Sequence, residues 1–260
     1  MTAETLTLIA LTFGVAMLYS SVGHGGASGY LAAMGLIGMA PEQMKPTALV
    51  LNLLVAGVGT LRYVRSDCFS WGSFWPFAVG SIPFAFLGGS HQLAPRVYQQ
   101  VLGVVLILAA AGMIVRLRRQ EQTRSFPIPA GIAIGAAIGY VSGLIGVGGG
   151  IFLSPILILT RWAATKQTLG IAALFILVNS FAGLLGHIES VRHLPDIAAY
   201  IAVAALAGGL LGSWLGAKRL ATPALRVLLA AVLLTASFKL LRPDAPKASQ
   251  ARAPVSNQAS

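Results

Sequence analysis

The sequence predicts an all-α membrane protein, a polytopic bundle of transmembrane helices built from two homologous repeats. The chain of 260 residues has a mean hydropathy of +0.80, and only 10% of its residues are charged, whereas about a quarter are charged in a soluble domain. Two long uncharged stretches, one in each half, carry a glycine cluster near the middle. We therefore expect about eight full spans together with glycine-rich segments that are broken or re-entrant.

The apolar runs are long enough to form these spans, because a helix needs roughly 20 apolar residues to cross a bilayer. Besides the uncharged stretches at 5–41 and 125–160, the runs occupy residues 46–63, 71–89, 97–115, 168–188, 197–216 and 224–241. The first segment is expected to be retained. Its N-terminal flank contains Glu4 and no basic residue, whereas a secretory signal begins with a positive region.

Matching residues in the two halves indicate an internal repeat. The pairs are Gly23 and Gly146, Gly25 and Gly148, Gly26 and Gly149, Asn52 and Asn179, and Pro95 and Pro223, with offsets that drift from 123 to 128. We therefore divide the chain into transmembrane repeats at 1–115 and 127–241, separated by a basic cytoplasmic loop at 116–126. The tail at 242–260 is rich in Ala, Pro, Ser and Gln, which predicts disorder.

The distribution of basic residues favours inverted repeats. Lys and Arg concentrate on the cytoplasmic side of membrane proteins, and the cluster of four arginines at 116–124 marks that side. If each uncharged stretch crosses once, the repeats are parallel, and seven of the 14 basic residues before Lys239 lie inside. If each stretch goes in and out, the repeats are inverted and eleven lie inside, although the basic residues of the tail then lie outside.

The two glycine clusters are the candidate binding site. They are Gly23-His24-Gly25-Gly26 and Gly146-Val147-Gly148-Gly149-Gly150. Glycine turns expose backbone N–H groups that form anion-binding nests, and a helix that restarts after the turn adds its positive end. Small residues also serve close helix packing in membranes. Two clusters at equivalent positions nevertheless favour two half-sites that face one buried anion.

Three polar residues complete the candidate site. His24 is the only His, Asp, Glu, Lys or Arg between Glu4 and Glu42, so it could donate to an anion or titrate near neutral pH. A neutral histidine bonded to a nearby carbonyl is the alternative. Asn52 and Asn179 interrupt apolar helices, where an amide either faces the substrate or bonds a neighbouring helix.

Charged residues near the spans narrow the substrate class. Lys45, Lys166 and Gln167 lie just before the helices that carry the two asparagines, where they either attract an anion to a cavity mouth or snorkel to the interface. All seven acidic residues lie outside the apolar spans. Cation carriers usually place carboxylates in the membrane, so the sequence favours an anion.

Several other functions are not expected. The net charge of +11 comes mostly from residues that flank the spans, and no motif interleaves them with stacking aromatic residues, so we expect no nucleic acid. Cys68 is the only cysteine, which excludes an intrachain disulfide and a thiolate metal site. We expect no metal and no cofactor. The expected partners are the lipid bilayer and a small-molecule anion, with a homodimer left open.

The glycine clusters resemble the TauE/SafE sulfite exporter family. The similarity is carried by Ser21-Val22-Gly23-His24-Gly25-Gly26-Ala27-Ser28-Gly29, by Gly143-Leu144-Ile145-Gly146-Val147-Gly148-Gly149-Gly150 with Ser154-Pro155, and by the stretch from Lys166-Gln167 to Asn179 and His187. The first cluster departs from the second, with His24 in place of Val147 and no proline after the turn. The resemblance implies a multi-pass permease of the bacterial inner membrane that moves sulfite, sulfonates or related sulfur-containing anions.

An intramembrane serine hydrolase of the rhomboid type is the alternative function. Gly26-Ala27-Ser28-Gly29 matches the G-x-S-G pattern of these proteases, and His187 would be the distant base. A nucleophile needs its base within hydrogen-bond reach. The pattern is short, and Ile151 stands at the position equivalent to Ser28 in the second half. We therefore expect a permease and not an enzyme.

Overall fold

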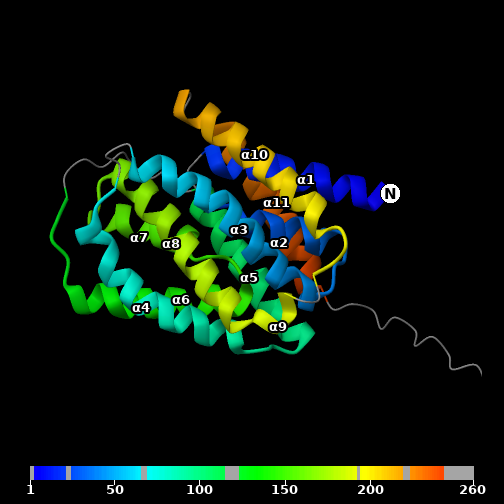
Figure 1. Ribbon diagram of the computed structural model, residues 1–260, viewed down its shortest axis with the longest axis horizontal. Helices are drawn as coiled ribbons and strands as arrows, with labels where there is room; N and C mark the ends of the chain where they lie inside the picture. Colours follow the sequence, from blue (N-terminus) through cyan, green and yellow to red (C-terminus); the bar gives the residue numbers. More distant parts are fainter. Residues whose placement is uncertain are drawn as a thin grey trace, which may run out of the picture.

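The computed structural model describes residues 3–21, 25–65, 69–114, 123–191, 194–218 and 223–242. All regular secondary structure within these ranges is helical (Figure 1). Two of the candidate site residues, Gly23 and His24, lie outside the described ranges, as do Cys68, most of the basic loop at 116–126 and the tail from residue 243.

Eight long helices, two ten-residue helices and one single turn make up the described secondary structure. The long helices are α1 (Ala3–Ser21), α3 (Pro41–Val64), α4 (Trp71–Ser90), α5 (Pro95–Ile114), α6 (Ile128–Ile145), α8 (Thr165–Gly186), α10 (Ala198–Lys218) and α11 (Pro223–Leu241). The short helices are α2 (Ala27–Leu36), α7 (Gly150–Leu159) and the single turn α9 (Ile188–Val191). Prolines begin α3, α5 and α11, where the missing N–H group has no helical partner to lose.

Six of the described helices are long and apolar enough to cross a membrane. They are α1, α3, α6, α8, the segment Pro95–Gly112 of α5 and the segment Ala198–Leu215 of α10. Helix α4 has 20 residues but contains Pro76 and Pro83 together with several Ser and Gly residues, and α11 has 19 residues. The expectation of about eight spans requires α4 and α11 as well, so that number stays a prediction.

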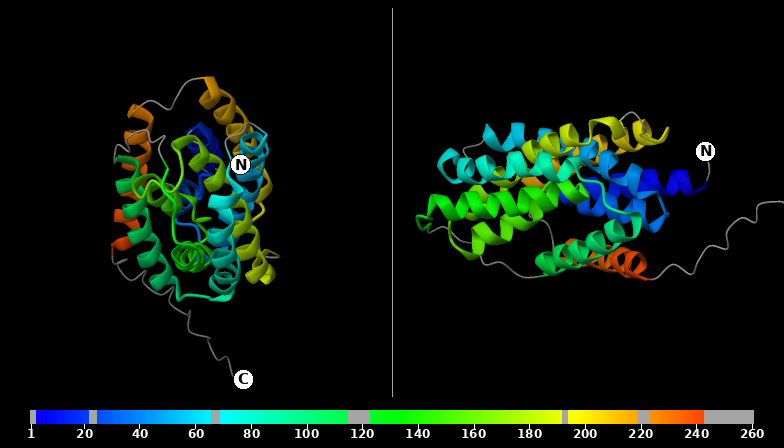
Figure 2. Two further views of the ribbon diagram at one scale, coloured as in Figure 1. Left: turned by 90° about the vertical axis from the view of Figure 1, so that its left-hand side faces the viewer. Right: turned by 90° about the horizontal axis from the view of Figure 1, so that it is seen from below.

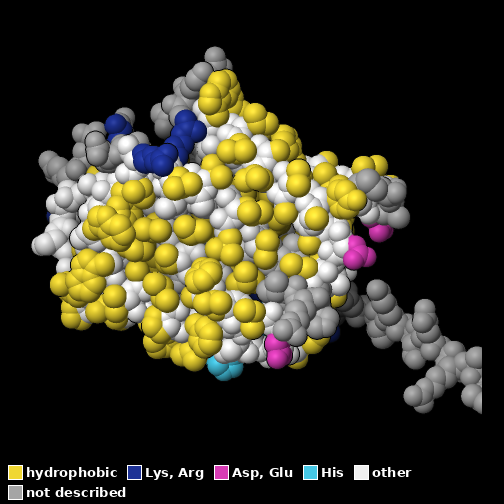
Figure 3. Space-filling model, in the orientation of Figure 1, with side chains coloured by type: hydrophobic (Ala, Val, Ile, Leu, Met, Phe, Trp, Pro, Cys, Tyr) yellow, Lys and Arg dark blue, Asp and Glu magenta, His cyan; other side chains and the backbone are white. Residues whose placement is uncertain are grey.

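The outer surface is suited to lipid. Hydrophobic side chains cover most of the face shown in Figure 3, whereas Lys and Arg gather at its upper left and Asp and Glu toward its right. Large apolar residues such as Val203 on α10 and Leu108 on α5 are 70% and 56% exposed. Apolar exposure on this scale would be costly in water. The described helices therefore agree with the helical membrane bundle that the sequence predicts.

Each uncharged stretch contains a long helix, a glycine turn and a short helix. Gly26 and Gly149 have positive φ angles, 93° and 80°, and cap the N-termini of α2 and α7. The short helices also end alike, because Gly38 and Arg161 both adopt positive φ angles at positions 123 residues apart. Both stretches are therefore broken helices, and their short helices begin and end with the same backbone conformation.

The long helices pack in pairs through glycines. Helix α4 packs on α6 and α1 packs on α10, while α3 packs on α8 near the middle of the bundle (Figure 1). Helices α5 and α11 form another pair along one side (Figure 2). Glycines of α6 face backbone atoms of α4 directly, with Gly135 against Phe77, Gly139 against Ser81 and Gly143 against Ala85. Small residues thus allow backbone contact between helices, as is common in membranes.

This packing predicts that Gly139→Leu destabilises the fold. A Cβ atom on Gly139 would lie 2.3 Å from the carbonyl oxygen of Ser81, and backbone cannot move aside as a flexible side chain can. We expect a loss of about 3 kcal/mol, at the upper end of the cost of overpacking. Thermal unfolding in detergent would measure it. Gly72→Leu on α4 is the matched control, because a Cβ atom there meets nothing within 4 Å, and its melting temperature should stay at the wild-type value.

Candidate functional site

The two glycine turns converge on one side chain, the amide of Asn52. A Cβ atom on Gly25 would lie 2.9 Å from Asn52 Oδ1, and a Cβ atom on Gly148 would lie 2.6 Å from Asn52 Nδ2. Both positions would also lie 2.9 Å from Cγ2 of Ile176. Asn52 is on α3 and Ile176 on α8, so the central helix pair brings the turns together. The amide therefore lies between two segments that are far apart in the sequence.

Free backbone donors collect at these turns. Residues 25–30 and 146–150 are buried. Within the described ranges, no atom accepts a hydrogen bond from the backbone N–H groups of Gly25, Gly26, Gly148 or Gly149. The first helical bond of α2 is the one from Tyr30 N–H to the Gly26 carbonyl, at 3.0 Å. Buried backbone donors are nearly always paired, so these groups are available to a ligand.

The remaining glycines of the second cluster have packing roles. A Cβ atom on Gly146 would approach the Lys45 backbone, with 3.1 Å to its carbonyl oxygen, and one on Gly150 would lie 2.5 Å from the Ile176 side chain. Gly146 has a φ angle of 85° and ends α6 with a bond from its N–H to the Ser142 carbonyl. The second cluster thus contributes four glycines to the predicted site, of which Gly148 and Gly149 present free backbone donors from the turn itself.

Hydrogen bonds fix the orientation of both asparagines. Asn52 Nδ2 donates to the carbonyl oxygen of Val147 at 3.3 Å and to Ser180 Oγ at 3.2 Å. Asn179 Nδ2 donates to the carbonyl oxygen of Phe175 at 2.7 Å. Both side chains are fully buried, and neither Oδ1 atom has a partner among the described residues. Asn52 contacts both turns, whereas Asn179 lies one turn of α8 away from Ile176.

Two cavities lie toward opposite ends of α3. One has a volume of about 10 Å³ and is lined by Gly25, Ser20, Tyr63 and Ser213 among others. The other has a volume of about 90 Å³ and is lined by residues that include Lys45, Tyr98 and His187. The first cavity reaches the turn before α2. Asn52 lies on α3 between the two.

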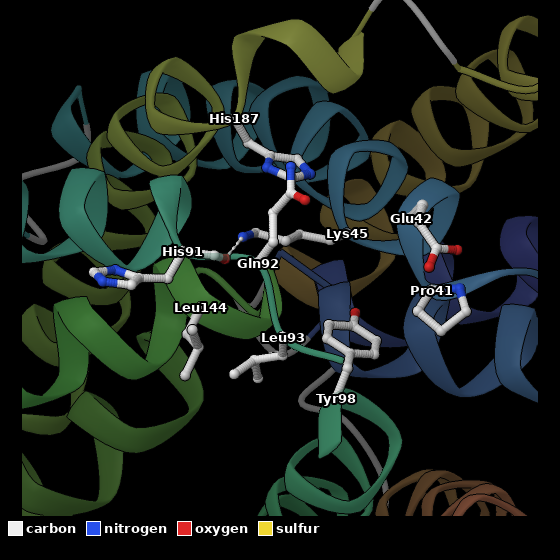
Figure 4. A pocket seen from close by; sticks show the side chains of 9 residues that line it. All are labelled: Pro41, Glu42, Lys45, His91, Gln92, Leu93, Tyr98, Leu144 and His187. Carbon is white, nitrogen blue, oxygen red and sulfur yellow. Dashed lines mark hydrogen bonds between the residues drawn. The ribbon is translucent and has the colours of Figure 1, made fainter. Parts of the chain in front are cut away.

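Lys45 is buried at the second cavity and caps α4 (Figure 4). Its Nζ donates to the carbonyl oxygens of Gly89 at 2.8 Å, His91 at 3.2 Å and Gly88 at 3.4 Å. The last carbonyls of a helix have no intrahelical partner and carry its negative end, so an ammonium group stabilises them. The sequence left two roles open for this lysine, attraction of an anion to a cavity mouth and snorkelling to the interface. The structure shows a cation whose three donors are already used by the protein.

His187 lies beside this lysine and is uncharged. Burial, followed by the neighbouring Lys45 ammonium, lowers the pKa of His187 to about 4, and a hydrogen bond with the Gly89 backbone opposes the shift. The imidazole is therefore neutral near pH 7. His187 adds hydrogen bonding to the second cavity and no positive charge.

The structure does not support a serine hydrolase. Ser28 Oγ forms a hydrogen bond of 2.8 Å with Tyr19 Oη. His187 lies instead against Lys45 and Gly89 at the end of α4. No hydrogen bond joins Ser28 to His187 within the described residues, and a nucleophile needs its base within reach.

Comparison with known proteins agrees with the architecture. A family model described as sulfite exporter TauE/SafE matches residues 8–240. The probable membrane transporter protein y4hK of Sinorhizobium fredii is 39% identical over 246 residues, which cover 93% of this chain and all of the relative. The probable membrane transporter protein YjnA of Bacillus subtilis is 27% identical over 256 residues, which cover 91% of this chain and all of that protein. No solved structure gives a significant match.

The family match covers both glycine turns, the central helices α3 and α8 and all six candidate spans, apart from the first few residues of α1. The relatives are transporters by name and match along their whole length. The chain is therefore a multi-pass membrane protein that belongs to the TauE/SafE sulfite exporter family.

Proposed function

We propose that the protein is a permease that binds a small anion between the N-termini of α2 and α7. The observation that carries this proposal is the convergence of two buried glycine turns on Asn52, with backbone N–H groups that have no acceptor in the described chain. Each turn also presents the positive end of a ten-residue helix. Donors and helix ends of this kind stabilise negative charge without a basic side chain.

The rest of the membrane interior is consistent with an anion. The acidic residues within the described chain stand at helix ends or in loops, as Glu42 does in the first turn of α3. A negative ligand at the turns therefore meets no buried carboxylate. His24 remains a proposed donor to the same anion because it lies directly before Gly25 in the sequence.

The two halves would act as inverted repeats that move against each other. Helix α1 packs on α10 and α6 packs on α4, so the first helix of each half packs on a late helix of the other half. Helices α3 and α8 lie between them. A pair of equivalent broken segments around one site is the usual arrangement of transporters with inverted repeats. Inversion here requires an odd number of crossings in each half, so that each broken segment goes into the membrane and returns.

The two cavities are the proposed routes to the site from opposite sides. Lys45 and Asn52 are separated by about 10 Å of helix, and Asn52 and Tyr63 by about 16 Å, at a rise of 1.5 Å per residue. Their sum is close to the hydrocarbon thickness of a bilayer, about 30 Å. The Tyr63 cavity reaches Gly25, while Lys45 and Gly146 separate the other cavity from the turns.

The family points to a sulfur-containing oxyanion or an organosulfonate as the substrate. Uptake of labelled sulfite into proteoliposomes tests this directly. We expect saturable uptake that exceeds protein-free liposomes and is reduced by unlabelled sulfonates. Saturable transport of potassium or ammonium, with no transport of any sulfur anion, would contradict both the anion site and the substrate class.

A further inference from the structure

We infer that the transported anion also carries a hydrogen-bond donor, which is accepted by Asn52 Oδ1. The inference rests on the proposed anion site and adds a requirement to it. The turns supply donors for the negatively charged oxygens of the ligand. Asn52 supplies an acceptor beside the same turns. An acceptor recognises an O–H or N–H group of the ligand instead of its negatively charged oxygens.

The direction of the Asn52 amide is set by its neighbours. A carbonyl oxygen only accepts hydrogen bonds, so the bond to Val147 O requires the NH₂ group of Asn52 on that side. Ser180 Oγ accepts a second bond from the same nitrogen. The oxygen of the amide is consequently directed at the first turn, 2.9 Å from the Cβ position of Gly25. It cannot be exchanged with the nitrogen without placing two acceptors against each other.

No described residue donates a hydrogen bond to the amide oxygen of Asn52. The Asn52 side chain is also fully buried. A buried acceptor without a partner is unfavourable, because it has lost the hydrogen bond that water would give it in the unfolded chain. A ligand O–H or N–H group bound at the turns would satisfy it. The cavity that reaches Gly25 is also lined by Ser20, whose buried hydroxyl has no partner among the described residues and can donate or accept.

Asn179 repeats this arrangement on α8. Its Nδ2 is held by the Phe175 carbonyl, and its buried Oδ1 is unpaired within the described chain. In both asparagines the amide nitrogen donates to a backbone carbonyl, while the amide oxygen has no partner among the described residues. Because this occurs at both equivalent positions, it argues for a role in ligand binding over an isolated packing defect.

The requirement separates two classes of sulfur anion. Hydrogen sulfite and sulfonates that bear an amino or hydroxyl group provide both negative oxygens and a donor. Sulfate and simple alkylsulfonates provide only acceptors, so they would leave Asn52 Oδ1 unpaired. A site built to bond a substrate O–H or N–H group discriminates strongly against analogues that lack it.

Sulfamate and methanesulfonate form the matched pair that tests this inference. They have the same charge and nearly the same shape, and they differ in an NH₂ group that replaces a CH₃ group. Affinity would be measured as inhibition of labelled sulfite uptake in proteoliposomes. We expect sulfamate to inhibit at a concentration about tenfold lower. Asn52→Leu should reduce this ratio to about one, whereas Ser180→Ala should retain it because Val147 still orients the amide.

The outcomes separate the inference from the proposed function. Equal inhibition of wild-type protein by the two anions would overturn the donor requirement and leave the anion site intact. Inhibition by neither anion, together with absent sulfite uptake, would overturn both. The wild-type comparison needs no substitution, so a folding defect in Asn52→Leu protein would not obscure it.

Discussion

Gly148→Val protein should enter the membrane and lose sulfite transport by about 100-fold, the scale of loss when a binding geometry is displaced by about 1 Å. A Cβ atom at this position would lie 2.6 Å from Asn52 Nδ2 and 3.0 Å from Ser180 Oγ. The φ angle of 81° adds strain for any residue with a side chain. The turn would have to move away from Asn52. Uptake normalised to the amount of inserted protein is the measurement.

Substitutions at two other glycines distinguish the two causes of this loss, which are crowding against Asn52 and backbone strain. Gly38 has a similar φ angle of 77°, but a Cβ atom there meets nothing within 4 Å, so Gly38→Val imposes backbone strain alone. Gly25 is not in the positive-φ region, so Gly25→Ala imposes crowding against Asn52 alone. We expect Gly38→Val to transport nearly normally and Gly25→Ala to resemble Gly148→Val. Normal uptake by Gly148→Val protein would show that the glycine turns do not form the binding site.

Lys45→Met should lower the free energy of unfolding by about 3 kcal/mol, because hydrogen bonds to a buried charged group are among the strongest in a protein. Methionine keeps the apolar stem of the lysine and removes the ammonium group. The carbonyl oxygens of Gly88, Gly89 and His91 would then lose their donor at the end of α4. Denaturant unfolding in detergent micelles would give the difference.

Lys166→Met is the control for this loss. Lys166 stands in the first turn of α8 and is exposed, so its removal should change stability by less than about 0.5 kcal/mol. A Lys45→Met protein of normal stability that fails to bind sulfite would show that the lysine serves the substrate and not the helix end.

The sequence was sufficient to predict the helical class and the breaks in the helices. Long uncharged segments and glycine clusters are local signals, and the structure forms α2 and α7 directly after those clusters. The equivalence of Gly26 with Gly149 was visible as a fixed offset. The same offset relates Gly38 to Arg161, but an arginine gives no hint of a left-handed backbone, so this match could not be read from residue types.

The contacts that build the candidate site were not predictable. Ile176 and Ser180 touch the second turn because α8 packs on α3, and such pairing across the bundle leaves no mark in either segment alone. Asn52 was identified as an interruption of an apolar helix, but the direction of its amide depends on Val147. The role of Lys45 was missed because a lysine at the start of a helix usually reaches the interface. Only the position of the α4 C-terminus shows that it is a cap.

The position of a bound anion tests the central claim most directly. Selenite has the shape and charge of sulfite and a strong anomalous scattering signal, so a crystal structure with selenite would place the ion without ambiguity. We predict an anomalous peak between Gly25–Gly26 and Gly148–Gly149, within hydrogen-bond distance of their backbone N–H groups and beside Asn52. A peak confined to the cavity at Lys45 and His187, with none at the turns, would contradict the account.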